Sequence, residues 1–306
     1  MQSIFVEKIS RERKVRMSTA KGFDQLVLQN KIDVISHQWN LCNIRPFLSG
    51  STNNYSAQVY SEKYKTDIVL KVLFVDTHEP EALIYFNGNG CVKILDYDEK
   101  LKCFLMEYVQ PGTMLKSLFP ENDNDALTIV AQLIKQMHVK KAPAPIVGFK
   151  TINQWLEILH NVKSTKIAAD MLIKAQKLSL KLLEREQKLY VLHGDLHHEN
   201  VLKNGHEWIV IDPKGVIGPL EYEVGRFIMN PIFQLLQQSN ARHIIANRIN
   251  KFSEIFDFDK QRLIDWAFAQ AVLSACWAEE DGREDVFNYF VKFAKIIEKI
   301  SRDELV

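Results

Sequence analysis

The sequence is poor in cysteine and carries almost no excess of charge. Four of its 306 residues are cysteines, and no two of them form a Cys-x-x-Cys pair. This usage fits reduced thiols, so we expect a cytoplasmic protein without a disulfide framework. The net charge of +1 gives no overall attraction for nucleic acid or for an anionic membrane surface. We therefore expect no nucleic-acid partner.

Long apolar runs are also missing. None reaches the ~20 residues that a membrane-spanning helix needs, and the nearest, residues 266–278, is interrupted by Gln270 and Ser274. Residues 1–16 carry charges too early and too often for the apolar region of a signal peptide. We therefore expect no membrane partner. With 46% hydrophobic and 25% charged residues, the composition is that of an ordinary soluble globular protein.

Apolar periodicity divides the chain into a β-rich part and a helical part. Residues 1–40 are predicted to be helical, and strands are predicted at 43–49, 55–61, 67–75, 92–96 and 102–109. After the Gln-Pro-Gly-Thr break at 110–113, helices are predicted at 126–139, 152–161, 168–189, 222–238, 241–256, 259–280 and 286–300. This order predicts an α+β protein with a small β-rich lobe over residues 1–110 and a larger helical lobe over residues 111–306.

The polar residues with the clearest chemistry lie in and after residues 193–200, which read His-Gly-Asp-Leu-His-His-Glu-Asn. A second apolar run, Trp-Ile-Val-Ile at 208–211, leads directly into Asp212. In phosphoryl transfer on a kinase scaffold, an Asp accepts the proton of the acceptor hydroxyl, and an Asn five residues later holds Mg²⁺ together with a following Asp. Asp195, Asn200 and Asp212 have this order and spacing. They predict a catalytic base and two Mg²⁺ ligands in an ATP-dependent enzyme with a protein-kinase-like bilobal fold.

Two other interpretations of the same segment stay open. The crowding of His193, His197 and His198 with acids is also typical of a zinc site, which would make the protein a metallohydrolase. Such a site usually needs further ligands, and only His206 and His243 follow in the sequence. A polar surface loop without chemistry is the plainest alternative, but it leaves the acid directly behind an apolar strand unexplained.

A lone lysine in an apolar strand predicts a nucleotide contact in the first lobe. Lys71 is the one charged residue of Ile-Val-Leu-Lys-Val-Leu-Phe at 68–74, and a buried ammonium is costly unless it is paired. In kinases the lysine of the third strand contacts the ATP phosphates and pairs with an acid on the next helix. Glu81 is the predicted partner. A lysine that faces solvent from an edge strand is the alternative.

Two further stretches are predicted to contact the nucleotide. The turn at 50–54, with Ser51, could turn its backbone N–H groups toward phosphates, although its single glycine is equally typical of a plain hairpin. Residues 107–109 precede the Pro-Gly break, where a kinase places the hinge that binds adenine. Glu107 and Val109 are therefore predicted to contribute backbone groups to adenine binding.

The chain resembles the aminoglycoside phosphotransferase superfamily, and within it the streptomycin 6-phosphotransferase or aminoglycoside/hydroxyurea resistance kinase group. The resemblance runs from about residue 49 to residue 282 and is carried by 193–200, Ile-Asp-Pro-Lys-Gly at 211–215, His-Glu-Pro-Glu-Ala-Leu at 78–83, Asn-Pro at 230–231 and the late stretch 266–282. Glu199 departs from it, because Gly is usual just before the Asn. The resemblance implies transfer of the ATP γ-phosphoryl group to a hydroxyl of a small antibiotic such as streptomycin. Another alcohol or aminosugar as acceptor, or a nucleotide-binding module without turnover, are the alternatives.

An acceptor of this class is cationic, so its site should present acids. The candidates are Glu221 and Glu223 after the metal segment, and Glu280 and Asp281 at the end of the helix predicted over residues 259–280. Trp277 could offer a ring face to a guanidinium. Acids at a helix C-terminus oppose the helix dipole, which favours a function for them, while solvated surface acids are the alternative.

Overall fold

The computed structural model describes residues 25–47, 54–138, 148–162, 164, 166–184 and 188–300, which fall into two units. The first unit comprises the described residues up to Pro80 together with Val92–Val109, and the second comprises Glu81–Cys91 and the described residues from Gln110 onward. The second unit thus takes residues 81–91, which the sequence assigns to the first lobe. The predicted nucleotide contact Ser51 lies outside the described residues, as do residues 1–24 of the helical segment predicted over residues 1–40.

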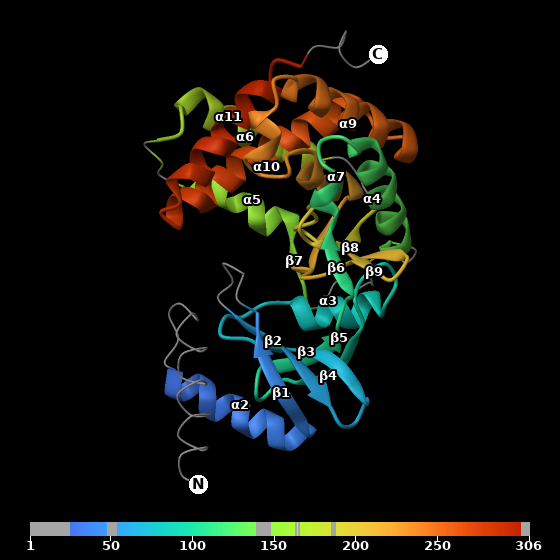
Figure 1. Ribbon diagram of the computed structural model, residues 1–306. Coiled ribbons are helices and arrows are strands. Elements are labelled where there is room, and N and C mark those ends of the chain that lie inside the picture. The colour runs from blue at the N-terminus through green and yellow to red at the C-terminus, as the bar shows by residue number, and fades with distance from the viewer. Residues whose placement is uncertain are drawn as a thin grey trace. The chain divides into compact units, whose positions relative to one another are not determined.

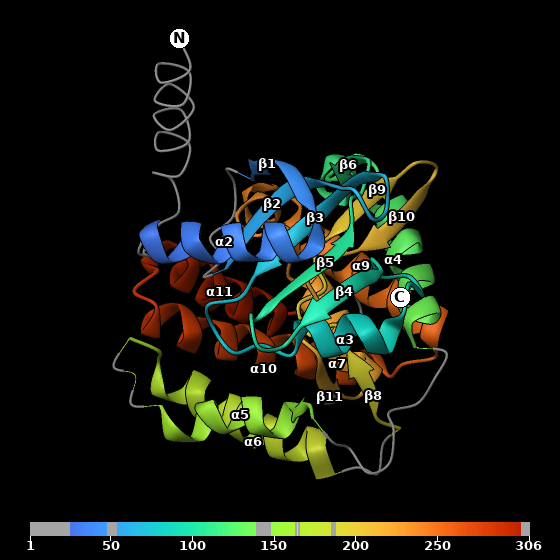
Figure 2. The same ribbon diagram turned by 90° about the horizontal axis from the view of Figure 1, so that it is seen from below.

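The first unit is an antiparallel sheet covered by a helix. Strands β1 (Leu41–Pro46), β2 (Tyr55–Ser61), β3 (Thr66–Val72), β5 (Cys103–Glu107) and β4 (Ile94–Asp98) pair in the order β1-β2-β3-β5-β4. Every second residue of β2 is buried, because alternate side chains of a strand point to opposite faces. Helix α2 (Gln25–Trp39) packs Leu28, Ile32 and Ile35 into the same hydrophobic core as the sheet, and Figure 2 shows it beside β1 and β2. All five predicted strands are therefore present.

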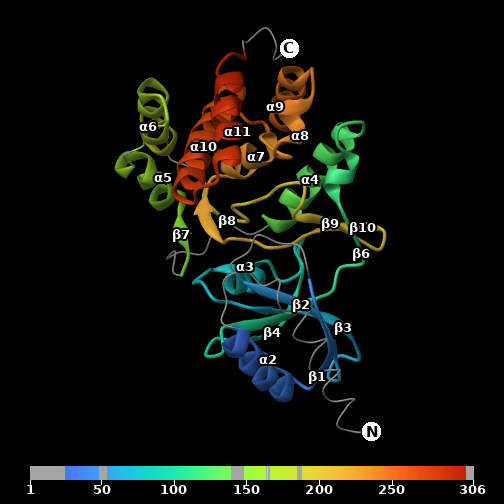
Figure 3. The same ribbon diagram turned by 60° about the vertical axis from the view of Figure 1, so that its left-hand side comes forward.

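Helix α10 (Lys260–Glu280) lies at the centre of the second unit, where Figure 3 shows it beside α11 (Glu284–Ile297). Every residue from Leu263 to Cys276 is buried, as expected for a helix enclosed by other elements. Around it pack α5 (Ile152–Asn161), α6 (Ala169–Glu184), α7 (Leu220–Ile228) and α9 (Ala241–Phe256). The helix begins where the carboxylate of Asp259 accepts the N–H of Arg262.

Two small sheets hold the polar segments that the sequence singles out (Figure 1). One joins β7 (Lys150–Thr151), β11 (Val216–Gly218) and β8 (Tyr190–Leu192), and the other joins β10 (Glu207–Val210), β9 (Val201–Asn204) and β6 (Pro111–Met114). Residues 193–200 connect β8 to β9, and residues 211–215 connect β10 to β11. The remaining elements are α3 (Glu79–Phe86), the 3-10 helix η1 (Leu115–Leu118), α4 (Asp123–Met137) and α8 (Gln234–Gln237).

The helix predicted over residues 222–238 is interrupted. Helix α7 ends at Ile228, and the short α8 begins at Gln234. Pro231 cannot donate a backbone hydrogen bond and its ring restricts Asn230, so the helical pattern stops before it. The side chain of Asn230 instead donates to the carbonyl oxygen of Arg226.

All four cysteines are free thiols, and only Cys42 among them is exposed. Within the described ranges, no helix combines the length and the hydropathy that crossing a membrane requires.

The prediction of an α+β fold is confirmed, because strands are concentrated in the first unit and helices in the second.

Candidate active site

Both ring nitrogens of His193 make hydrogen bonds that hold the loop carrying Asp195. The N–H of Asp195 donates to Nδ1 of His193 over 3.1 Å, and Nε2 of the same ring donates to the carbonyl oxygen of Ile211 over 2.8 Å. Nδ1 therefore carries no proton, and burial lowers the pKa of His193 to about 4. The neutral ring joins the Asp195 loop to the strand end that carries Asp212.

Arg226 of α7 occupies one oxygen of the Asp195 carboxylate. Its Nε and one terminal nitrogen both lie within 2.8 Å of Oδ1, while Oδ2 lies 3.8 Å from Nε2 of His197, too far for a hydrogen bond. Burial opposes ionisation of Asp195, but the positive charges of Arg226 and Lys214 outweigh it and hold the pKa of this carboxyl well below its usual range. Asp195 is thus ionised and presents Oδ2.

The side chains of Asn200 and Asp212 offer oxygen donors of the kind that Mg²⁺ prefers. The amide nitrogen of Asn200 donates to the carbonyl oxygen of Asp195 over 3.0 Å, which fixes the orientation of the amide, so Oδ1 is the atom of this side chain that could bind a metal ion. The N–H of Ile211 donates to the carbonyl oxygen of Asn200, so the two segments run together. Oδ2 of Asp212 accepts Nζ of Lys214 over 2.6 Å. A carboxylate and an amide oxygen on adjoining segments fit a hard divalent cation.

The three neighbouring histidines do not form a zinc site. His193 contacts the Ile211 carbonyl, Nδ1 of His197 accepts the N–H of Glu199, and His198 stacks on Phe227 with ring centroids 4.1 Å apart. Among the described residues, no three His, Cys, Asp or Glu side chains converge where a metal ion could be held. The structure gives no support to the metallohydrolase interpretation.

Glu223 was predicted to bind a cationic acceptor, and this prediction is wrong. Its side chain is fully buried and accepts the backbone N–H groups of His193 (2.6 Å) and Gly194 (2.9 Å). Burial raises the pKa of Glu223 to about 7, in opposition to these two hydrogen bonds. Glu223 anchors the turn before Asp195 and has no surface to offer a ligand.

Three other predicted acceptor acids also lie away from Asp195. The carboxylate of Glu221 accepts Nε of Arg262 over 2.9 Å, so its charge is already paired. Glu280 and Asp281 are exposed at the end of α10. None of them is among the described residues that line the pocket next to Asp195.

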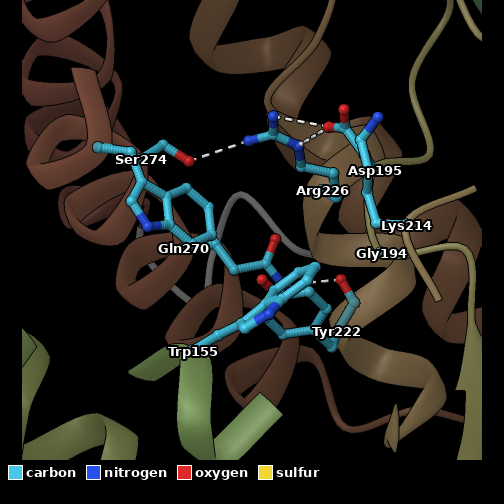
Figure 4. A pocket seen from close by; sticks show the side chains of 9 residues that line it. Trp155, Gly194, Asp195, Lys214, Tyr222, Arg226, Gln270 and Ser274 are labelled. Carbon is cyan, nitrogen blue, oxygen red and sulfur yellow. Dashed lines mark hydrogen bonds and ion pairs between the residues drawn. The ribbon is translucent and has the colours of Figure 1, made fainter. Parts of the chain in front are cut away.

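A pocket of about 280 Å³ adjoins Asp195 (Figure 4). Its described lining residues come from α5, the two loops, α7 and α10, and are Trp155, Gly194, Asp195, Lys214, Tyr222, Arg226, Gln270, Ser274 and Trp277. Figure 4 shows Arg226 between Asp195 and Ser274, whose Oγ accepts the third guanidinium nitrogen over 2.9 Å. Of the residues predicted for acceptor binding, only Trp277 lines this pocket.

The lining also contains residues to which the sequence pattern assigns no role. Arg226 lies three residues after Glu223 on α7, and such neighbours share a helix face. Gln270, Ser274 and Trp277 are spaced four and three residues apart on α10, which again places them on one face. The two polar interruptions of the apolar stretch were therefore a usable signal for a functional face of this helix.

Lys71 of β3 is buried and paired, but with a different acid from the predicted one. Its Nζ lies 2.7 Å from the carboxylate of Glu79, and the two side chains are only 6% and 3% exposed. Helix α3 begins at Glu79, and Pro80 is tolerated there because it lies in the first turn of the helix. Glu81 as the partner of Lys71 is thus a wrong prediction.

The segment predicted to bind adenine ends strand β5. Glu107 exchanges hydrogen bonds with Lys93, its N–H donating to the Lys93 carbonyl and its Oε2 accepting the Lys93 N–H. Val109 is buried two residues later. The backbone N–H of Glu107 therefore already donates to a backbone carbonyl oxygen. Adenine binding by Glu107 and Val109 stays a prediction.

Solved structures of small-molecule kinases share this fold. A choline kinase from Streptococcus pneumoniae has a TM-score of 0.65 at 13% identity, over 90% of this chain and 99% of that one. An ethanolamine kinase from Plasmodium vivax has a TM-score of 0.61 at 14% identity, over 97% and 95%. An amicoumacin kinase in complex with AMP-PNP and Ca²⁺ has a TM-score of 0.60 at 14% identity, over 94% and 96%. The chain therefore has the kinase-type fold of these phosphotransferases.

Sequence comparison gives the family. The model of the aminoglycoside/hydroxyurea antibiotic resistance kinase family matches residues 64–282, and the chain belongs to that family, as predicted. Streptomycin 6-kinase of Streptomyces griseus is 27% identical over 206 residues, which cover 64% of this chain and 65% of that protein. Hydroxyurea phosphotransferase of Kitasatospora aureofaciens is 26% identical over 262 residues, 83% of this chain and 74% of that protein. The chain thus spans about two thirds to three quarters of these relatives.

Proposed function

We propose that this protein transfers the γ-phosphoryl group of ATP to a hydroxyl of a small molecule bound next to Asp195. The observation that carries the proposal is the Asp195 carboxylate, which lines a pocket and presents Oδ2 while Arg226 occupies Oδ1. A carboxylate placed in this way can accept a hydrogen bond from an acceptor hydroxyl and align it for attack. It receives the proton as the transfer proceeds, so its low pKa suits positioning more than early deprotonation.

The remaining roles follow from charge and position. Lys71, fixed by Glu79, would contact the ATP phosphates from the first unit. Asn200 and Asp212 would hold Mg²⁺ in the second unit, and Glu107 and Val109 would contact adenine. Bound Mg²⁺ supplies neutralisation of the phosphate charge that develops during transfer. His193 and Glu223 keep the Asp195 loop in place through backbone hydrogen bonds.

Two acceptors follow from the names of the relatives. Streptomycin is the acceptor that the sequence predicts, and relatives named streptomycin 6-kinase and streptomycin 3''-kinase support it. Hydroxyurea is the second candidate, and the observation in its favour is that none of the predicted acids Glu221, Glu223, Glu280 and Asp281 is among the described residues that line the pocket. An uncharged acceptor has no need of these acids.

The test is Mg²⁺-dependent ADP release by the purified protein with a panel of acceptors, run beside two variants. Asp195→Asn keeps the shape of the side chain but cannot take the proton, so acceptor-stimulated release should fall by at least 100-fold. Asp281→Asn removes an exposed acid of the same kind outside the pocket and should leave the rate within twofold. Acceptor-stimulated release that survives Asp195→Asn, or is absent for every hydroxyl compound tried, would sink the proposal.

A further inference from the structure

Helix α10 places the side-chain amide of Gln270 in the lining of the pocket next to Asp195. The residue is only 1% exposed and belongs to a largely apolar part of the helix. In the view of Figure 4 its amide lies between Trp155 and Arg226. Burying an amide is costly unless its nitrogen and its oxygen both find hydrogen-bond partners.

The amide nitrogen of Gln270 has a partner within the protein. Nε2 donates to the backbone carbonyl oxygen of Tyr222 in α7 over 2.7 Å. Because a carbonyl oxygen only accepts hydrogen bonds, this contact decides which end of the amide is the nitrogen. Gly225 of α7 leaves space for the amide, since a Cβ there would lie 3.0 Å from Nε2 and 3.3 Å from Oε1. Helix α7 thus fixes the orientation of the amide.

The amide oxygen of Gln270 has no such partner. Oε1 is buried and accepts no hydrogen bond from any residue in the described part of the chain. Most buried polar atoms of folded proteins are hydrogen-bonded, and an exception costs free energy of folding. The contact with Tyr222 accounts for the nitrogen of the amide but not for its oxygen. A purely structural role therefore explains only half of this side chain.

The charged groups of the lining are already paired. Arg226 binds Oδ1 of Asp195 over 2.7 Å. Lys214 binds Asp212 over 2.6 Å. Oδ2 of Asp195 is the atom that the reacting hydroxyl of an acceptor needs. A second donor group of the same acceptor, either O–H or N–H, can instead donate to Oε1 of Gln270.

We infer that Oε1 of Gln270 accepts a hydrogen bond from a second O–H or N–H group of the acceptor, so that this residue selects acceptors that carry such a group beside the reacting hydroxyl. The inference rests on the proposed function, because it concerns the molecule bound next to Asp195. A site with a buried acceptor atom discriminates strongly against a ligand that lacks the matching donor, because the atom is then left unpaired. Gln270 is therefore a specificity-determining residue.

Binding of two pairs of small hydroxyl compounds tests the inference. Ethanolamine and choline have the same charge and the same hydroxyl, but only ethanolamine has N–H donors. Hydroxyurea and N-hydroxy-N′,N′-dimethylurea differ at one nitrogen in the same way, without a charge. Because Trp155 and Trp277 line the pocket, quenching of tryptophan fluorescence measures occupancy without catalysis. We expect the donor-bearing member of at least one pair to bind roughly tenfold more tightly or better, the order expected for one hydrogen bond.

The variant Gln270→Met separates this contact from the difference in size within each pair. It keeps the length of the side chain and removes the amide, so the preference should fall below threefold. Gln261→Met is the matched control, because Gln261 lies on the same helix but is exposed and is not among the described lining residues. It should leave the preference within twofold. An unchanged preference in Gln270→Met overturns the inference, and so does the absence of a preference in both pairs or of any binding.

Gly225→Ala tests the same contact with Gln270 in place. The added Cβ would crowd the amide and displace Oε1, so the preference should fall at least threefold in a protein that keeps its native melting curve. ADP release, measured in parallel, distinguishes the inference from the proposed function. Selective binding without ADP release contradicts the proposed function and leaves the selectivity of Gln270 standing. ADP release with no preference for the donor-bearing compounds contradicts the inference alone.

Discussion

Lys71 and Glu79 are charged residues that burial makes dependent on each other. Their ion pair is almost fully enclosed, so removing one charge leaves the other buried without its partner. Such a loss typically costs about 3–5 kcal/mol of stability. In Glu79→Gln we expect a lower melting temperature and a KM for ATP at least tenfold higher, because Lys71 is no longer fixed. Thermal unfolding and ATP-dependent kinetics at saturating acceptor measure the two effects.

Glu81→Gln is the matched control for this substitution. Both acids lie in the first turn of α3, and the sequence alone assigns the pairing role to Glu81. Because the observed ion pair uses Glu79, Glu81→Gln should change the KM for ATP by less than threefold. A larger effect at Glu81 than at Glu79 would contradict the pairing seen in the structure.

Glu223 makes folding stability depend on pH in an unusual direction. Its pKa is raised from 4.5 to about 7, so between these values the folded protein keeps a proton that the unfolded chain has lost. Stability therefore falls as the pH rises through this window, by about 2–3 kcal/mol between pH 5 and pH 8. Nε2 of His138 lies 3.9 Å from Oε1 of Glu223. This histidine stays neutral between pH 5 and pH 8 because burial lowers its pKa to about 4.

Glu223→Gln removes this titration. The variant should gain stability relative to the native protein as the pH rises from 5 to 8, although it loses one acceptor for the His193 and Gly194 N–H groups. Urea unfolding at both pH values measures the difference, and the exposed Glu280, substituted in the same way, serves as the control. A gap between Glu223→Gln and native protein that does not change with pH would refute this assignment.

At the scale of the element, the turn before Asp195 depends on glycine. Gly194 has φ of +79°, and a Cβ there would lie 2.8 Å from Cγ1 of Val216 and 3.0 Å from the Trp155 ring. Gly194→Ala must therefore shift the Asp195 loop or the pocket wall. Because small displacements of reacting groups are costly, we expect kcat to fall roughly 10- to 100-fold while the protein stays folded.

Gly205→Ala separates backbone strain from crowding. Gly205, in the turn between β9 and β10, also has a positive φ (+57°), but an added Cβ meets no heavy atom within 4 Å. The substitution should cost roughly 1–2 kcal/mol of stability and leave kcat unchanged. Equal losses of kcat in both variants would show that the close contacts at Gly194 are unimportant.

Elements with a strong local pattern were predictable from the sequence. The strand Tyr55–Ser61 and the helices Ile152–Asn161 and Ala241–Phe256 have the predicted bounds, because apolar periodicity and end signals agree there. The loop 193–200 was recognisable because its spacing reflects chemistry within a single segment.

Contacts between distant segments were not predictable in the same way. Arg226 reaches Asp195 across 31 residues and Ser274 across 48, and both contacts depend on how α7 packs against α10. Glu223 has the composition of a surface acid, yet the backbone N–H groups of the Asp195 loop bury it. Residue type alone cannot separate an acid that binds a ligand from one that anchors a loop, since the difference lies in the packing of other elements.

At the scale of the whole molecule, the response of thermal stability to ligands separates the three classes of function. A ligand that binds only the folded state and is present at 100 times its Kd stabilises that state by about 2.7 kcal/mol, which for a chain of 306 residues raises Tm by roughly 4 °C. We expect this shift with Mg²⁺ and AMP-PNP together, and a much smaller one with AMP-PNP in EDTA. Asp212→Asn should reduce the Mg²⁺-dependent part of the Tm shift, because it replaces a carboxylate that the metal would share with Asn200.

An increase in Tm with Zn²⁺ alone, without any response to nucleotide, would instead favour the metallohydrolase. A full nucleotide shift without acceptor-stimulated ADP release would point to a binding module that lacks turnover.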